Sequence, residues 1–279
     1  MIATLGLFTW LIDPYRSGFM QRALLAVLLI GTFVPAVGVW IVLRRLSYLG
    51  DAMSHAVLAG VAGAYLAGFS ITIGALIAGL AMAAIIAVLG RFPKLQEDAA
   101  IGVAETILFA LGLVLIARRS NRIGIDLTHF LFGQLATTSV SDLRLNAILA
   151  GVGLGLMALL FHDLRAATFD AIHARLVGVR VGAISTGLLV LLALAIVVSL
   201  QTVGLLMSVA MLVSPATTAR MLSDRLPLTI MLASGIGIAS GVVGLTLAYH
   251  LSCPPGATIA LVAAAALLLV LVAKTMRKQ

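Results

Sequence analysis

The sequence predicts an all-α membrane protein, a polytopic helical bundle with eight or nine transmembrane helices. Of its 279 residues, 62% are hydrophobic and only 10% are charged, whereas soluble domains carry about 25% charged residues. Apolar runs of about 18 residues or more recur along the chain, and each is long enough to cross a hydrocarbon core of ~30 Å. We therefore expect residues 1–279 to form a single transmembrane domain.

Nine apolar segments follow one another: 19–43, 46–69, 71–90, 99–117, 145–161, 184–200, 202–219, 228–249 and 256–273. The breaks at Gly68–Ser70 and Gln201–Thr202 are too short for ordinary loops, so the adjacent segments are interpreted as hairpins or broken helices. Pro215 is expected to kink or end the seventh helix, because proline has no N–H to donate. No small-residue cleavage site follows the first segment, so it is interpreted as a span and not as a removable signal peptide.

The basic residues predict that the amino terminus lies outside. If all nine segments cross, 12 of the 18 basic residues face the cytoplasm, and such an excess sets the orientation of membrane proteins. These twelve are Arg44, Arg45, Arg91, Lys94, Arg165, Arg175, Arg180, Arg220, Arg225, Lys274, Arg277 and Lys278. Membrane orientation thus explains the net charge of +8, and we expect no nucleic-acid partner.

Asp51 and His55 are polar side chains inside the second apolar segment. Residues i and i+4 share a helix face, so the carboxylate and the imidazole point the same way. If the helix begins at Leu46, His55 lies about 13–14 Å along it, close to the middle of a ~30 Å core. One carboxylate and one imidazole suit a divalent first-row ion such as manganese, iron or zinc. Two ligands are too few for tight binding, and a two-fold dimer would double the set.

The alternative role of the pair is structural, with Asp51 near the helix start and His55 hydrogen-bonded to it. Glu105 is the other acidic residue inside an apolar segment, where an ionisable group costs at least ~2.5–3.5 kcal/mol and normally faces a cavity or a partner. It is a candidate for the ion pathway; the alternatives are that it extends toward the membrane surface or is protonated beside Thr106. His129 is a second pathway candidate, in the outer loop 117–143, where the stretch HFLFGQL is expected to form a short interfacial helix.

The longest polar stretch on the predicted cytoplasmic side is 162–182. Apolar residues recur in it at helical spacing with charges between them: Phe169, Ile172, Leu176 and Val179. This pattern is typical of a short amphipathic helix that lies against the membrane or a partner. The sequence contains no G-x-x-x-x-G-K-[ST] phosphate loop, no G-x-G-x-x-G and no H-E-x-x-H. Powered transport would therefore draw its energy from another subunit.

Five stretches of the sequence, taken in order, resemble one known family. They are RRLSYLGDAMSHAVLAGVAGAYLAG, DLTHFLFGQL, FDAIHARLVGV, VGLLMSVAMLVSPATTARML and PPGATIALVAAAALLLV. The family comprises the permease subunits of bacterial ABC importers for manganese, zinc and related metals. The resemblance runs from about Met20 to Leu271, which is nearly the whole chain.

The resemblance implies a homodimeric ABC importer permease in the bacterial cytoplasmic membrane. Two ATP-binding cassette ATPase subunits would hold the ATP, an extracytoplasmic protein would deliver the metal, and the chain itself would be no enzyme and keep no permanent cofactor. The family's Asp-x-x-x-His pair falls on Asp51 and His55, where both protomers together would hold the ion. The family's coupling helix, which docks on the ATPase, falls near 169–179, on Phe169, Asp170, Ala171, Ala174, Arg175, Leu176 and Gly178.

The chain departs from the family pattern at three positions. Ala59 stands where the family often has proline, Glu105 where it usually has a neutral residue, and Thr128 where an acid is more usual. The stretch GDAMSHAVLAG resembles manganese-type relatives, and SYLGD also resembles zinc-type ones. Raw affinity favours zinc over manganese. Manganese is nevertheless favoured here as the transported metal, with zinc next and iron last.

Two other functions are alternatives to a permease of this family. An ion-coupled secondary cation transporter would use Asp51, His55 and Glu105 as proton or cation relays. Many such transporters are built from inverted repeats, and none is seen in this sequence. An intramembrane metal hydrolase would need a third ligand and an activated water, which one Asp–His pair does not supply.

Overall fold

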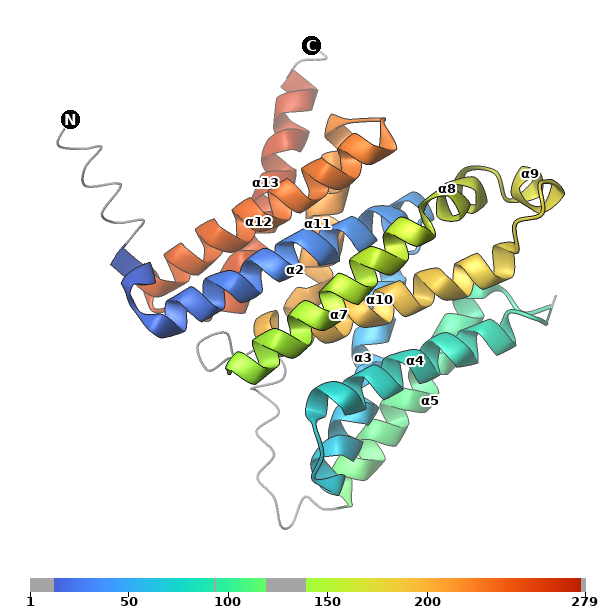
Figure 1. Ribbon diagram of the computed structural model, residues 1–279, viewed down its shortest axis with the longest axis horizontal. Coiled ribbons are helices and arrows are strands. Elements are labelled where there is room, and N and C mark those ends of the chain that lie inside the picture. The colour runs from blue at the N-terminus through green and yellow to red at the C-terminus, as the bar shows by residue number, and fades with distance from the viewer. Residues whose placement is uncertain (1–12, 93, 119–138, 277–279) are drawn as a thin grey trace. The chain divides into compact units, whose positions relative to one another are not determined.

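The computed structural model describes residues 13–92, 94–118 and 139–276, and every regular element in these ranges is a helix (Figure 1). The elements are η1 (Asp13–Arg16), α2 (Gly18–Leu43), α3 (Ser47–Ala67), α4 (Ile71–Leu89), α5 (Glu97–Ala117), α7 (Val140–Leu159), α8 (Phe161–Phe169), α9 (Ala171–Leu176), α10 (Val181–Val203), α11 (Leu205–Leu222), α12 (Leu226–Leu251) and α13 (Pro255–Met276). For these residues the predicted all-α fold is confirmed.

The nine predicted apolar segments fall in nine separate long helices of the described chain. Seven of these are long and apolar enough to cross a membrane: α2, α4, α5, α7, α10, α12 and α13. The other two are α3 and α11. Helix α3 has 21 residues, about 31 Å at 1.5 Å per residue, and its Asp51 and His55 lower its hydropathy. The total of eight or nine spans remains a prediction.

The break predicted at Gly68–Ser70 is confirmed. Helix α3 ends at Ala67, and Gly68 follows with a φ of 75° and donates its N–H to the carbonyl of Ala64. A left-handed residue at this position is a common helix end, because it satisfies a free carbonyl of the last turn. Helices α3 and α4 are therefore separate elements joined by a short turn.

The break predicted at Gln201–Thr202 is wrong in position. Helix α10 continues to Val203, and the chain turns at Gly204, whose φ is 87°. Only glycine adopts this region readily, so the glycine and not the polar pair separates α10 from α11. Pro215, expected to kink or end this helix, lies inside α11 and does not end it, because α11 continues to Leu222.

The described residues fall into two compact units. The first lies within Met1–Val39, Thr128–Ala150 and Ser199–Gln279, and the second lies within Trp40–Leu127 and Gly151–Val198. In the first unit, α11, α12 and α13 pack against one another. Helix α2 approaches α12 closely, because a Cβ on Gly237 would lie 2.5 Å from Cγ of Pro35.

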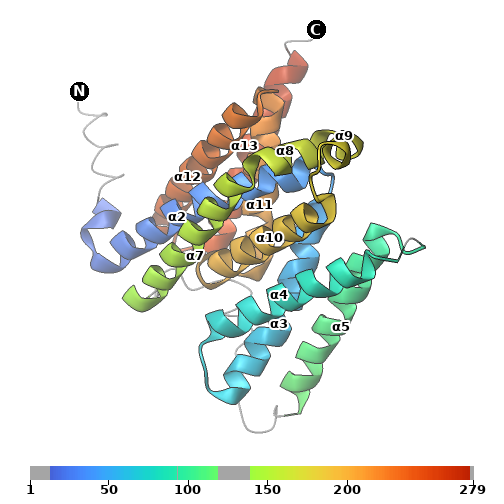
Figure 2. The same ribbon diagram turned by 45° about the vertical axis from the view of Figure 1, so that its right-hand side comes forward.

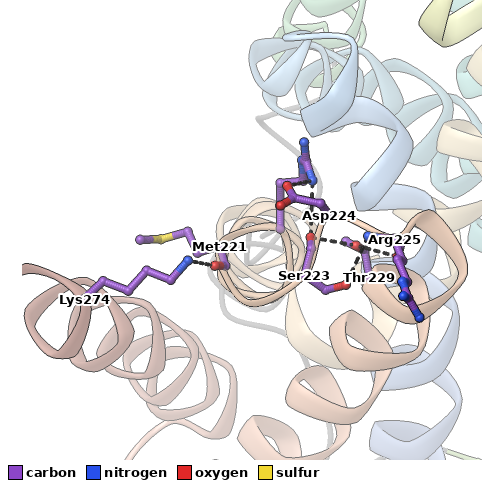
Figure 3. A network of polar contacts seen from close by, with 7 residues as sticks. Met221, Ser223, Asp224, Arg225, Thr229 and Lys274 are labelled. Atoms are coloured by element: carbon purple, nitrogen blue, oxygen red, sulfur yellow. Dashed lines mark hydrogen bonds and ion pairs between the residues drawn. The ribbon is translucent and has the colours of Figure 1, made fainter. Parts of the chain in front are cut away.

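Polar contacts close the turn between α11 and α12 (Figure 3). The Thr229 hydroxyl donates to the Ser223 carbonyl at 3.1 Å, and the Arg225 N–H donates to the Ser223 hydroxyl at 3.1 Å. From α13, the Lys274 ammonium donates to the carbonyl of Met221. Carbonyls at a helix end lack partners within the helix and attract cations, so these contacts stabilise the end of α11.

In the second unit, α3 packs against both α4 and α5, which lie beside it in Figures 1 and 2. A Cβ on Gly60 would lie 1.9 Å from the carbonyl oxygen of Gly74 on α4. A Cβ on Gly112 of α5 would lie 3.0 Å from the backbone nitrogen of Ala59. Small residues at these crossings let the backbones approach closely, and this packing brings α5 against the helix that carries Asp51 and His55.

The Gly60 crossing gives a stability prediction with a control on the same helix. We expect Gly60→Ala to destabilise the protein by about 1–3 kcal/mol, because the added methyl group overpacks the α3–α4 contact. A Cβ on Gly63 meets nothing within 4 Å, so Gly63→Ala is expected to be neutral or slightly stabilising through helix propensity. Thermal unfolding of the detergent-purified variants measures both. Equal unfolding midpoints for the two variants would contradict the prediction.

Candidate functional site

Asp51 and His55 lie one turn apart in the first half of α3, and both are half-buried. The described structure contains no hydrogen bond or ion pair between them, and Nδ1 of His55 bonds to another residue. Within the described residues, no hydrogen bond or ion pair engages the carboxylate of Asp51. The structural alternative, in which His55 bonds to Asp51, is therefore wrong.

The partner of His55 is Glu105 on α5. Nδ1 of His55 lies 2.9 Å from Oε1 of Glu105, and the side chains are 36% and 16% exposed. Glu105 does not hydrogen-bond the neighbouring Thr106, whose hydroxyl donates to the carbonyl of Gly102. A carboxylate in an apolar segment normally has a partner, and here the imidazole supplies it.

Two aromatic residues complete the surroundings of this pair. The hydroxyl of Tyr48 donates to Oε2 of Glu105 at 2.6 Å. The ring of Phe109, one turn beyond Glu105 on α5, lies 5.4 Å from the ring of His55 between centroids. Both carboxylate oxygens of Glu105 are thus engaged, and the imidazole is held by the acid on one side and by Phe109 on another.

Nδ1 of His55 faces Glu105, and Nε2 has no hydrogen-bond partner among the described residues. A carboxylate only accepts hydrogen bonds, so with Glu105 in that form Nδ1 carries the proton in this contact. The lone pair is then on Nε2. A carboxylate that accepts from one ring nitrogen of a histidine is the usual outer partner of a metal-binding imidazole, because it fixes the tautomer and the ring orientation. His55 can therefore act as a ligand through Nε2.

A single chain offers an incomplete set of metal ligands. Across the described ranges, no group of three or more His, Cys, Asp or Glu side chains is placed to hold a metal ion. Asp51 supplies carboxylate oxygens, and His55 supplies one nitrogen. A transported cation would need further ligands in addition to Asp51 and His55.

The second region with a predicted function is the polar stretch 162–182, which contains the predicted coupling segment. The single amphipathic helix expected over 169–179 is instead divided at Asp170, whose carboxylate accepts the N–H groups of Ile172 and His173 at 3.1 and 2.8 Å and so begins α9. An N-terminal cap of this kind satisfies donors that the helix itself cannot. Helix α9 is therefore only six residues long, and Gly178 follows it with a φ of 88°.

Helix α9 presents an apolar surface to its surroundings. Ile172 is 75% exposed and Leu176, one turn later, is 81% exposed, while Ala174 between them is fully buried. Phe169, at the end of α8, is 61% exposed. Exposed apolar residues next to one another mark an interaction surface, and these residues coincide with the predicted coupling segment.

Sequence reasoning did not identify Tyr48 or Phe109 as neighbours of the site. An aromatic residue in an apolar helix has no distinctive sequence signal, and the partner of each lies on another helix. His129 and the rest of the outer loop lie outside the described residues.

Comparison with known proteins identifies the family. The model of the ABC 3 transport family matches residues 16–274. The manganese transport system membrane protein MntC of Halalkalibacterium halodurans is 39% identical over 261 residues, covering 91% of this chain and 87% of that protein. The chelated iron transport system membrane protein YfeD of Yersinia pestis is 34% identical over 260 residues, covering 92% of this chain and 86% of that protein.

Solved structures agree with this result. PsaBC from Streptococcus pneumoniae, in complex with Fab, matches with a TM-score of 0.83 and 35% identity, covering 97% of this chain and 95% of that chain. A structure described as an inward-facing metal-chelate type ABC transporter matches with a TM-score of 0.69, over 90% of this chain and 85% of that chain. At 16% identity it shares the fold alone.

These matches confirm the family resemblance, and with the apolar helices they establish a multi-pass protein of the inner membrane. ATP hydrolysis in such transporters belongs to partner subunits, so this chain is not itself an enzyme. The chain belongs to the ABC 3 transport family, as a non-catalytic membrane subunit of an ABC-type transporter.

Proposed function

We propose that the chain is the transmembrane subunit of an ATP-driven importer that moves a divalent transition metal across the inner membrane. The observation that carries this proposal is the arrangement on α3, where the carboxylate of Asp51 and Nε2 of His55 share one helix face and are not engaged by described residues. The names of the relatives, for manganese and for chelated iron transport, support a metal as the cargo.

The metal site is completed by a second copy of the chain. One chain supplies an oxygen ligand and a nitrogen ligand, and a two-fold axis close to α3 doubles the set to two oxygens and two nitrogens. A set of mixed carboxylate and imidazole ligands suits manganese, iron or zinc. Manganese is favoured because MntC shares 39% of its aligned residues with this chain.

Glu105 acts in this site by holding His55. Its Oε1 accepts the Nδ1 proton, and Tyr48 holds the other oxygen, at 2.9 and 2.6 Å respectively. With the ring fixed in this way, Nε2 stays available to the cargo without a rearrangement at each passage. Outer carboxylates of this kind also raise the basicity of the imidazole ligand.

The energy for transport comes from two ATPase subunits that dock on α9, while an extracytoplasmic metal-binding protein delivers the cargo. The exposed apolar side chains of Ile172 and Leu176 provide the docking contact, and Asp170 fixes the start of the helix. Movement of α9 with the ATPase would switch the metal site between outward and inward access.

The α3 pair gives the first functional prediction. We expect His55→Ala and Asp51→Asn each to reduce uptake of radioactive manganese to background in cells that also express the ATPase, because each variant removes two of the four ligands in the dimer. The control is His162→Ala, an exposed histidine of α8, at matched membrane levels. Undiminished uptake in both site variants would contradict the assignment. Uptake by the wild type without the ATPase would favour the ion-coupled secondary transporter.

The role of Glu105 gives a graded prediction. We expect Glu105→Gln to weaken metal affinity and uptake by about 10–100-fold, the range found when an outer partner of a metal-binding histidine is lost. Thr106→Val changes the next residue on α5, whose hydroxyl bonds the carbonyl of Gly102 and not His55, and this variant is expected to transport normally. Manganese binding to the purified protein and uptake in cells measure both effects. Equal affinities in the two variants would exclude the positioning role.

The docking surface gives a prediction about assembly. We expect Ile172→Glu to reduce recovery of the ATPase with the purified chain by about 30-fold, which corresponds to an interface anchor worth about 2 kcal/mol. His162→Glu places the same charge on an exposed residue of α8 and serves as the control. Full ATPase recovery with Ile172→Glu would show that α9 is not the docking contact.

A further inference from the structure

A cavity of about 670 Å³ lies within the second compact unit, apart from the α3 pair. Its wall is formed by the turn after α2, the first turn of α3, the end of α4, the start of α5, helix α9 and the first turns of α10. The lining residues that matter here are Arg44, Arg91, Glu97, Arg175, Gly182 and Leu46. The roles proposed above for the Asp51–His55 pair and for the apolar face of α9 do not assign a function to this cavity.

The charge of the cavity wall is positive. Three guanidinium groups, of Arg44, Arg91 and Arg175, face one carboxylate, that of Glu97, so three positive charges less one negative charge leave +2. The arginines come from three different segments of the chain. A concave surface lined by charges of one sign concentrates ions of the opposite sign, and the wall therefore attracts an anion.

Arg44 is fixed in position on this wall. Its Nε donates to the Thr168 hydroxyl and its Nη1 to the Ser185 hydroxyl, each at 3.0 Å. Its Nη2 is buried and has no hydrogen-bond partner. Burial lowers the pKa of the Arg44 guanidinium, and the charge of Glu97 partly opposes this effect. A buried charged donor without a partner indicates a site where an acceptor is missing, and Arg44 thus points to an oxyanion.

The start of α10 adds neutral donors to the same wall. Gly182 and Ala183 line the cavity, and the first turn of α10 contains no acidic residue. The N–H of Val181, which also lines it, donates to the carbonyl of Val179. A Cβ on Gly182 would meet nothing within 4 Å, so the backbone there is open to a ligand. N–H groups of a first helical turn lack partners within the helix and favour anions, phosphate in particular.

The remainder of the wall is apolar. Leu46, Ala87 and Leu95 line the cavity and are only half-buried, so their side chains are open to a ligand. A free phosphate ion would not be stabilised by these apolar side chains. The glycerol and acyl parts of a lipid would be, because they can pack against them. The orientation predicted from the basic residues places Arg44, Arg91 and Arg175 on the cytoplasmic side, where anionic lipid headgroups gather and basic pockets between helices bind them.

We propose that this cavity binds a phosphate group, and that an anionic phospholipid of the cytoplasmic leaflet supplies it. The arginines and the first turn of α10 hold the phosphate, and the side chains of Leu46, Ala87 and Leu95 contact the rest of the lipid. Because Arg175 belongs to α9, the bound lipid links the docking helix to the ends of α2 and α4.

The test uses the purified full-length chain in a neutral detergent, with bound lipid counted by native mass spectrometry. Phosphatidylglycerol is titrated in parallel with phosphatidylcholine and with inorganic phosphate. We expect phosphatidylglycerol to be retained over phosphatidylcholine, and Arg91→Gln to weaken its retention about fivefold, the effect of one basic residue near a membrane surface. The matched control is Lys94→Gln, which removes an equal charge from the same connection between α4 and α5 but lies outside the cavity wall.

Three results would overturn the proposal. Equal loss in Arg91→Gln and Lys94→Gln would show diffuse attraction and no site. Displacement of phosphatidylglycerol by millimolar inorganic phosphate would make the free ion the occupant. Loss of the lipid from the wild type on addition of the ATPase would assign the cavity to an acidic surface of that partner. Arg44→Gln is a further variant expected to weaken retention, and if it fails to fold, the double variant Arg91→Gln with Arg175→Gln replaces it.

Discussion

The contact between Glu105 and His55 is the interaction on which the candidate site depends. An ionisable side chain in hydrocarbon costs at least ~2.5–3.5 kcal/mol unless it has a partner, and here two such side chains on different helices supply each other with one. Their atoms lie 2.9 Å apart, and the contact ties α3 to α5. It also directs one nitrogen of the imidazole toward the acid, so that the other nitrogen and the carboxylate of Asp51 have no partner among the described residues.

This contact requires α3 and α5 to approach closely. Gly112 makes that possible, because its missing side chain leaves room for the backbone of α3 at Ala59. On the opposite neighbour, Gly60 and Gly74 allow a similarly close approach of α4. In a membrane, where lipid is as apolar as leucine, such small-residue crossings supply much of the packing between helices. The glycines of the second unit therefore position the polar pair as well as the helices.

At its predicted cytoplasmic end the same unit combines two surfaces of opposite character. Helix α9 exposes Ile172 and Leu176, which suit a protein partner, whereas the neighbouring cavity gathers arginines that suit an anion. Arg175 belongs to both, since it lies in α9 and lines the cavity. A partner that moves α9 would therefore change the cavity, and a ligand in the cavity would restrain α9.

The sequence alone determined the class of the protein, its apolar segments and the Asp51–His55 spacing, because hydropathy and helical periodicity are local properties. It also indicated the family through motifs in register, and the comparisons confirmed this. Only the tertiary structure showed that Glu105 pairs with His55, fifty residues away in the chain, and that Arg44 shares a cavity wall with Arg91 and Arg175. It also showed that Gly204 and not the polar pair before it ends α10. Pairing and backbone conformation depend on how distant helices meet, and no local pattern of residues contains that information.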